Sequence, residues 1–167
     1  YPNWINDMWR IFGHIFFNDK EHFVATDSSG MKIKRFDKER CSGFADEKGI
    51  AMYDTASQVR RLKDNASDKF LEVVEPTDIA ALLAQLPHLR AIVTTGEKAT
   101  ETICATLHIN SLPKVNTSVL IPALHNADGE QISLWRLPSS SRAYPLAFDK
   151  KVEAYRRMFN DIYIKLR

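Results

Sequence analysis

The sequence predicts an α/β fold, arranged as three layers with helices on both faces of a central, mainly parallel sheet. Short apolar runs with the character of strands alternate along the chain with segments of helical periodicity, which is the pattern of α/β proteins. The 167 residues suffice for one domain with a sizeable core, and no internal repeat or low-complexity tract divides them. We therefore expect a single domain over residues 1–167.

Helical periodicity is strongest near the two ends of the chain. Apolar residues recur at helical spacing over residues 4–16, and a second apolar stripe runs over residues 148–166. Inside the chain, one helix should begin at Thr77 as its N-cap, and another should cover residues 97–107. The polar segment 18–40 holds a Ser-Ser-Gly turn and alternating charges, so we expect a loop or excursion there.

Three apolar runs have the character of strands in one sheet. They cover residues 50–53, 90–94 and 132–137. The last of them should form a hairpin with residues 117–123, because the Asn-Ala-Asp-Gly sequence at 126–129 is a good hairpin turn. We expect the first three runs to lie in one sheet with helices on both of its faces.

Composition narrows the classes of site. Cys41 and Cys104 are too few for a four-cysteine zinc or iron–sulfur site within the chain, and they indicate a reduced, cytoplasmic setting. The histidines show no paired metal-ligand spacing, so no metal or other cofactor is expected. No apolar run approaches the roughly 20 residues that span a bilayer, and residues 1–10 lack the pattern of a secretory leader. The formal charge of +2 permits nucleic-acid binding without requiring it.

Polar residues follow three of the expected strands, at the edge where ligand sites collect in α/β folds. They are Asp54, the turn Thr94-Thr95-Gly96, and the run Pro138-Ser139-Ser140-Ser141-Arg142. The hydroxyls and successive backbone amides of the last run are suited to holding a phosphate diester. A solvated serine-rich turn explains the same composition, and the residues alone leave both interpretations open.

Four segments of the chain resemble motifs of the uracil-DNA glycosylase superfamily, and they occur in the same order along the sequence as in that superfamily. Residues 1–9 are similar to the segment after the first motif of the mismatch-specific uracil and thymine DNA glycosylases, and residues 137–145 to their second motif. Residues 49–54, and 75–83 continued by 95–99, resemble the DNA-deoxyinosine glycosylase branch. The resemblance implies a monofunctional DNA glycosylase of base-excision repair. Such an enzyme hydrolyses the N-glycosidic bond of a flipped uracil or hypoxanthine without a cofactor.

The resemblance also implies roles for residues. Asn6 corresponds to a catalytic asparagine, and Tyr1 to the aromatic residue that stacks on the flipped base. Asp54 and Thr95, at the ends of expected strands, are candidates for the same base pocket. The loop that clamps the phosphates and fills the gap in the duplex corresponds to Ser139, Ser140, Ser141 and Arg142. Without the family, Asn6 is explained as a helix N-cap and Tyr1 as a frayed terminus.

The chain departs from the superfamily pattern in its opening. Superfamily members begin with a strand ending in a Gly-x-x-Pro-type loop, and residue 1 comes just after the place of that loop. We expect this strand upstream of Tyr1, and a chain lacking it should be much less active. Thr95 stands where the deoxyinosine branch usually has Asn, and Arg142 lies one residue earlier than the corresponding arginine.

The expected partner is DNA that carries a deaminated or mismatched base, bound by a monomer. Two other functions stay open at this point. One is a catalytically inactive DNA-binding relative, which the absent first motif favours. The other is an unrelated α/β module whose serine loop binds a free phosphate or a nucleotide.

Overall fold

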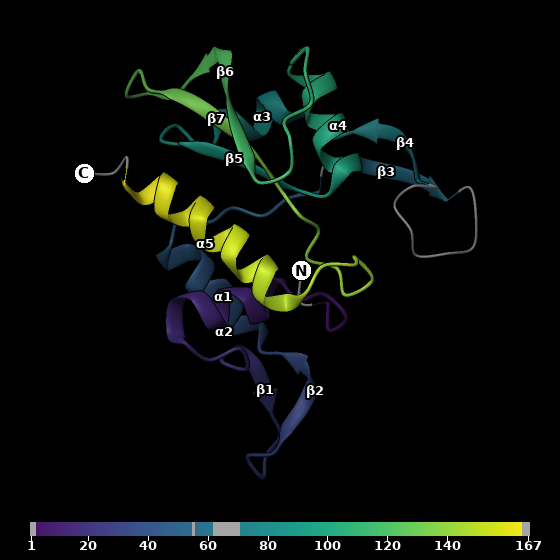
Figure 1. The fold of residues 1–167 in the computed structure, drawn as a ribbon, viewed down its shortest axis with the longest axis vertical. Coiled ribbons are helices and arrows are strands. Elements are labelled where there is room, and N and C mark those ends of the chain that lie inside the picture. Colours follow the sequence, from purple (N-terminus) through teal and green to yellow (C-terminus); the bar gives the residue numbers. More distant parts are fainter. Residues whose placement is uncertain (1–2, 55, 62–70, 165–167) are drawn as a thin grey trace. The chain divides into compact units, whose positions relative to one another are not determined.

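The computed structural model describes residues 3–54, 56–61 and 71–164 (Figure 1). These residues form helices and a mixed sheet, so the chain is an α/β protein as expected. They fall into two compact units. The first comprises Tyr1–Tyr53 and Ser139–Asp161, and the second comprises Asp54–Pro138 and Ile162–Arg167. Each unit is described below by itself.

The first unit contains three helices and one β-hairpin. Its elements are α1 (Met8–Phe17), β1 (Val24–Thr26), β2 (Lys32–Phe36), α2 (Lys38–Glu47) and α5 (Phe148–Ile164). The two strands are antiparallel, with an irregular register between Val24 and Thr26. The two helices expected from the apolar periodicity near the ends of the chain are confirmed as α1 and α5.

Aromatic side chains hold this unit together. Phe12 on α1 lies 6.0 Å from Phe44 on α2 and 5.5 Å from Phe159 on α5, measured between ring centroids. Trp9, one turn earlier on α1, lies 5.2 Å from Phe23, and both are buried. Pairs of this kind contribute about 0.5–1.5 kcal/mol beyond the burial of their area. The apolar stripe of α1 is therefore the centre of the core of the first unit.

Residues 18–40 are not the loop that we expected. They contain the β1–β2 hairpin and the first turn of α2. The hairpin turn is organised by Asp27, whose Oδ1 accepts hydrogen bonds from the amides of Ser29 and Met31 at 2.9 and 3.0 Å. Asp37 caps α2 by accepting from the Arg40 amide at 3.0 Å. Strands this short carry too little alternation to stand out from a polar background.

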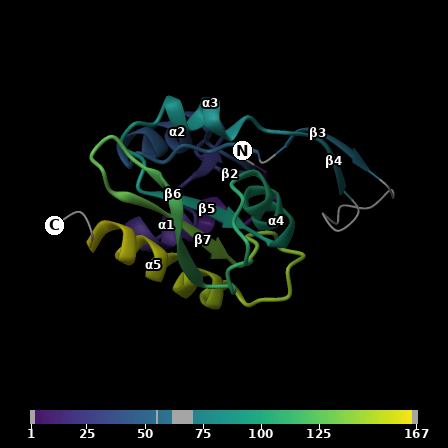
Figure 2. The same ribbon diagram turned by 90° about the horizontal axis from the view of Figure 1, so that it is seen from above.

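The second unit is built around a three-stranded sheet of order β5-β7-β6 (Figures 1 and 2). Its strands are β5 (Ala91–Thr95), β6 (Thr117–His125) and β7 (Gln131–Leu137). β5 runs parallel to β7, whereas β6 runs antiparallel to it. This sheet is therefore mixed, because the hairpin at 126–129 makes β6 and β7 antiparallel neighbours.

Two helices and a second hairpin complete this unit. The helices are α3 (Ile79–Ala84) and α4 (Glu97–Thr106), and the hairpin consists of β3 (Ala56–Arg61) and β4 (Leu71–Pro76). The hairpin is a separate two-stranded sheet. A continuous apolar cluster joins α3 and α4 to the three-stranded sheet. Its buried members are Ile79, Ile103, Cys104, Ile121, Ile132 and Leu134.

Residues 50–53 are not the third strand that we expected beside β5 and β7. They are irregular backbone without a strand partner in the described part of the chain, and Tyr53 is 68% exposed. Gly49 follows α2 with φ +63°, and the Ile50 amide still donates to the Ala45 carbonyl at 2.8 Å. These residues therefore finish the turn after α2. An apolar run becomes a strand only where another strand supplies hydrogen bonds.

The N-cap of α3 also differs from the expectation. Asp78, not Thr77, caps the helix by accepting from the Ala81 amide at 2.9 Å. The Thr77 hydroxyl instead donates to the Asp54 carbonyl at 2.6 Å. The expected strands at 90–94, 117–123 and 132–137 and the helix at 97–107 are confirmed within one or two residues. No helix among the described residues is long and apolar enough to span a membrane.

Candidate nucleic-acid interface

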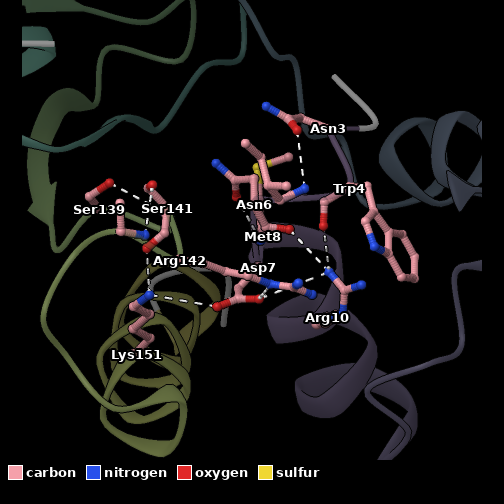
Figure 3. A network of polar contacts seen from close by, with 12 residues as sticks. Asn3, Trp4, Asn6, Asp7, Met8, Arg10, Ser139, Ser141, Arg142 and Lys151 are labelled. Carbon is pink, nitrogen blue, oxygen red and sulfur yellow. Dashed lines mark hydrogen bonds and ion pairs between the residues drawn. The ribbon is translucent and has the colours of Figure 1, made fainter. Parts of the chain in front are cut away.

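Two segments from opposite ends of the sequence meet in the first unit. Asn6 and Ser141 face each other in an isolated antiparallel bridge. On either side of it, the Asp7 amide donates to the Ser140 carbonyl at 2.9 Å, and the Arg142 amide donates to the Ile5 carbonyl at 3.4 Å. The expected catalytic residue thus lies against residues 139–142, which we call the clamp loop (Figure 3).

A cluster of charged side chains lies beneath this bridge. The Asp7 carboxylate is only 12% exposed, and its oxygens lie 2.9 Å from Arg142 Nε, 3.6 Å from Lys151 Nζ and 3.9 Å from Arg10 Nη1. These four residues form the Asp7 cluster (Figure 3). Three cations around one carboxylate leave a formal excess of two positive charges. Such an excess attracts anions, above all where burial lowers the local dielectric constant.

Lys151 is the most deeply buried member of the Asp7 cluster. Its side chain is 2% exposed, and its ammonium donates to the Ser141 carbonyl at 2.7 Å. Burying an ammonium is costly unless a counter-charge and hydrogen-bond acceptors accompany it. Asp7 and the clamp loop supply both, so the position of α5 is tied to the backbone of the loop.

Arg10 holds the Asn6 segment, on the other side of the bridge, in place. Its guanidinium carbon lies 4.1 Å from the centre of the Trp4 ring and 4.8 Å from that of Phe36. Its Nη1 donates to the carbonyls of Trp4 and Asn6 at 3.2 and 3.3 Å. Burial, and then the nearby Arg142, lowers the pKa of Arg10. An arginine starts so far above neutrality that it stays charged and keeps the Asn6 segment in place.

The three serines of the clamp loop have different roles. Ser139 and Ser141 are half-buried, and their hydroxyl oxygens accept from the amides of Ser141 and Ala143, each at 3.2 Å. Within the described residues neither hydroxyl donates a hydrogen bond, so both protons are available to a ligand. Ser140 is only 3% exposed and forms a side-chain hydrogen bond with Tyr155 on α5.

Two of our expectations for the clamp loop are therefore wrong. Ser140 is part of the core and not of the exposed surface, because its hydroxyl partners a buried tyrosine. Burial raises the pKa of Tyr155, and the bond from Ser140 opposes that rise in part. The successive amides of residues 141–144 are also unavailable to a phosphate, since each donates within the first unit. The donors that we assign to this loop are therefore the Ser139 and Ser141 hydroxyls and the Arg142 guanidinium, and not the amides of residues 141–144.

The side chain of Asn6 is divided between the two roles considered for it. Its Oδ1 accepts from the Met8 amide at 2.9 Å at the start of α1, which is a capping contact. Its Nδ2 has no hydrogen-bond partner among the described residues and is free to donate. Asp7, which occupies the N-cap position, makes no side-chain capping bond. The side chain of Asn6 therefore makes the capping contact of α1, and the side chain of Asp7 binds the cations of the Asp7 cluster instead.

The structure does not bring the other expected base-binding residues together within the first unit. Tyr1 is outside the described residues. Asp54 and Thr95 are exposed residues of the second unit. Beside Thr95, the buried Thr94 hydroxyl contacts Thr100 Oγ1 at 2.9 Å and donates to the Trp135 carbonyl at 3.1 Å. This arrangement fixes the end of β5, whereas the Thr95 side chain is on the surface.

Sequence reasoning did not single out Asp7, Arg10 or Lys151. Asp7 and Arg142 are 135 residues apart in the sequence, so no local spacing marks them as partners. One signal for Lys151 is its spacing, because it precedes the apolar Tyr155 and Met158 by four and seven residues and so lies on the same helix stripe. Among the residues that the structure describes, no group of three or more His, Cys, Asp or Glu side chains is placed to hold a metal ion.

Comparison with known proteins does not assign the chain to a family. No protein-family model, no curated protein and no solved structure matches it.

Proposed function

We propose that this protein is a DNA glycosylase of the uracil-DNA glycosylase superfamily, which removes a deaminated base such as uracil or hypoxanthine. The observation that carries the proposal is the bridge between Asn6 and Ser141. The segment that resembles the one after the first superfamily motif adjoins the segment that resembles the second, DNA-clamping motif, although they lie at opposite ends of the chain. A random resemblance of two short motifs would not require such an arrangement.

The chemistry of the clamp loop supports a phosphate diester as its ligand. The free hydroxyl protons of Ser139 and Ser141 and the half-exposed Arg142 guanidinium are donors that need no particular base sequence. The excess positive charge of the Asp7 cluster adds a long-range attraction for the DNA backbone. Phosphates held there position the nucleotide whose base is extruded.

Asn6 contributes to the bond-breaking step through its free amide. Breaking the N-glycosidic bond leaves positive charge on the sugar and negative charge on the departing base. The free Nδ2 group of Asn6 is a suitable donor to that negative charge or to the attacking water. An asparagine cannot take the proton of the water, so stabilisation of the leaving base must supply most of the rate. Bases that leave readily, such as uracil and hypoxanthine, are therefore the substrates that we propose.

The finer features of the superfamily belong to the same proposal. We propose that the chain forms one domain with helices on both faces of its sheet, and that it acts as a monomer on DNA. The packing of α3 and α4 against the three-stranded sheet is consistent with one of the two helical layers. Tyr1, Asp54 and Thr95 are the candidate base-binding residues of this proposal.

The decisive experiment is an excision assay with the protein that includes whatever sequence naturally precedes Tyr1. Labelled duplexes carry uracil, hypoxanthine, thymine opposite guanine, or no lesion, and abasic sites are revealed by alkaline cleavage in the presence of EDTA. We expect cleavage at uracil or hypoxanthine and none in the undamaged duplex. Binding of abasic duplex is measured in parallel, because it separates recognition from catalysis.

A catalytically inactive DNA-binding relative is the second candidate. One observation favours it: the Oδ1 atom of Asn6, which could orient a water, is already bonded to the Met8 amide. Specific binding of abasic duplex without release of any base would establish this second candidate. If the protein neither binds nor cuts these duplexes, both DNA functions are wrong. The clamp loop would then fit a module that binds free phosphate or a nucleotide.

A further inference from the structure

We propose that Lys151 is a positioning residue of the clamp loop: it does not contact DNA, but its buried ammonium fixes the loop in the conformation that binds phosphate. The inference rests on the proposed function, since it concerns how the same loop is held. It adds to that function a distinction between two cations: Arg142 contacts DNA, whereas Lys151 orders the loop.

The Ser141 carbonyl is the point at which Lys151 holds the loop. This oxygen accepts from Lys151 Nζ at 2.7 Å and from the Tyr144 amide at 3.1 Å. The same residue is bridged to Asn6, and its hydroxyl accepts from the Ala143 amide. Rotation of the Ser141 peptide would break all of these bonds together. Lys151 therefore restrains the direction in which the hydroxyls of the loop point.

Lys151 lies beside a counter-charge. Its ammonium lies 3.6 Å from Asp7 Oδ2, while the other oxygen of Asp7 binds Arg142 Nε at 2.9 Å. Asp7 thus connects the residue that holds the loop to the residue that projects from it. Without the carboxylate, two neighbouring cations would repel each other across a largely buried space.

The burial of Lys151 excludes direct contact with DNA. The Lys151 side chain is 2% exposed, whereas that of Arg142 is 45% exposed. Only Arg142 can neutralise a phosphate without rearrangement. A residue that contacts phosphate changes the salt dependence of binding, because each neutralised phosphate releases counterions. A residue that only orders the loop changes affinity and leaves the salt dependence as it was.

The test compares Lys151→Met with Arg142→Ala, and the matched control is Lys150→Met. Lys150 is adjacent on α5, but its side chain is 67% exposed and pairs with Glu153. Binding of abasic duplex is measured in the full-length protein by fluorescence anisotropy over a series of salt concentrations. We expect Lys151→Met to weaken binding roughly tenfold, as for loss of one charged hydrogen bond, with an unchanged salt slope. Arg142→Ala should reduce that slope by about one, and Lys150→Met should change neither quantity.

A second readout does not depend on DNA. Amide hydrogen exchange of residues 141–144 in the free protein should be at least about tenfold faster in Lys151→Met, with little change in α4 of the second unit. General destabilisation would instead accelerate exchange throughout the chain. Asp7→Asn tests the same link in a side chain of equal size, in case Lys151→Met does not fold, and should also accelerate exchange at 141–144.

Two results would overturn the inference. One is exchange at residues 141–144 that is unchanged in a folded Lys151→Met or Asp7→Asn protein. The other is a reduced salt slope in Lys151→Met, which would make Lys151 a phosphate contact. If the wild-type protein does not bind the duplex at all, the proposed function fails, and the exchange experiment still decides whether Lys151 orders the loop.

Discussion

Several polar residues of the first unit have roles that differ from those their positions in the sequence suggest. Asn6 caps α1 through Oδ1 and keeps Nδ2 free, while Asp7 leaves the capping role to join an ion cluster. Ser140 looks like a surface hydroxyl in the sequence but satisfies the buried Tyr155. Each polar group that is removed from water here has found a partner, which is the condition for burying it at modest cost.

Two substitutions of Asn6 separate its capping role from its catalytic role. Asn6→Ala removes both the Oδ1 acceptor and the Nδ2 donor, whereas Asn6→Asp keeps an acceptor for the Met8 amide and loses the donor. We expect both variants to excise the base roughly 10²-fold or more slowly, as after loss of one positioned donor. Only Asn6→Ala should also lose about 1 kcal/mol of stability, the usual contribution of a cap. Single-turnover excision and urea unfolding measure the two effects.

The control for these variants is Asn3→Ala. Asn3 makes a similar local bond, because its Oδ1 accepts from the Ile5 amide at 3.1 Å. Loss of that bond should leave the rate of excision close to that of the wild type. Full activity in Asn6→Asp would show that Asn6 is only a cap and would contradict its catalytic assignment.

At the scale of elements, α1 and α2 contain glycines in opposite situations. Gly13 is buried in α1, and a Cβ added there would lie 2.4 Å from the carbonyl oxygen of Asp19. The chain turns back at this point through Asn18, the C-cap of α1 with φ 54°. Gly43 is exposed in α2, and no atom lies within 4 Å of an added Cβ. Gly13 allows the Asp19 carbonyl to approach the helix closely, whereas no neighbouring atom requires a glycine at position 43.

Alanine substitutions should therefore change stability in opposite directions. Gly43→Ala should stabilise the protein by up to about 1 kcal/mol, because alanine is the better helix former. Gly13→Ala gains the same propensity but must displace backbone, which typically costs 1–3 kcal/mol or more, so a net loss is expected. Chemical denaturation of both variants measures the difference. A stable Gly13→Ala protein would show that the turn after α1 adjusts without strain.

At the scale of the whole molecule, the first unit is discontinuous in sequence. It is made of Tyr1–Tyr53 and Ser139–Asp161, with most of the second unit inserted between them. While the inserted segment is unfolded, the two parts of the first unit can meet only by closing a long loop, which costs conformational entropy. The first unit should therefore be stable only while the second is folded, as expected of one domain.

The two cysteines report on this coupling, because one lies in each unit. Cys41 is 4% exposed and Cys104 is 6% exposed. Burial raises the pKa of both thiols, that of Cys41 to about 12, with a smaller contribution from Asp37 to Cys41. Thiolate is the reactive form, so neither residue should be alkylated at neutral pH in the folded protein.

Pulsed alkylation across a urea gradient, read by peptide mass spectrometry, then follows each unit separately. We expect Cys41 and Cys104 to become reactive at the same urea concentration, as in one cooperative transition. Cys41→Ser and Cys104→Ser confirm the assignment of the labelled peptides. Labelling of one cysteine well before the other would show that the units unfold independently and would contradict the single domain.

Local patterns in the sequence are enough to locate several of the helices and strands. A period of 3.6 residues located α1 and α5, a period of 2 located β7, and a short apolar run located β5. The turn at 126–129 placed β6 beside β7. A glycine before residue 97 marked the start of α4. These features depend on neighbours within a few residues, so one stretch of sequence contains all the information needed to recognise them. The meeting of Asn6 with the clamp loop followed only from a family resemblance.

Tertiary structure alone decided the rest. Residues 50–53 are as apolar as a strand, yet they do not pair with another strand in the described part of the chain, because strand formation requires hydrogen bonds from a distant segment. Asp7 looks like an ordinary surface charge in the sequence, and only the fold places it 3.6 Å from Lys151, whose ammonium binds the Ser141 carbonyl. Coulomb attraction and burial depend on distances in space, and two residues far apart in the chain leave no local pattern that reveals such a distance.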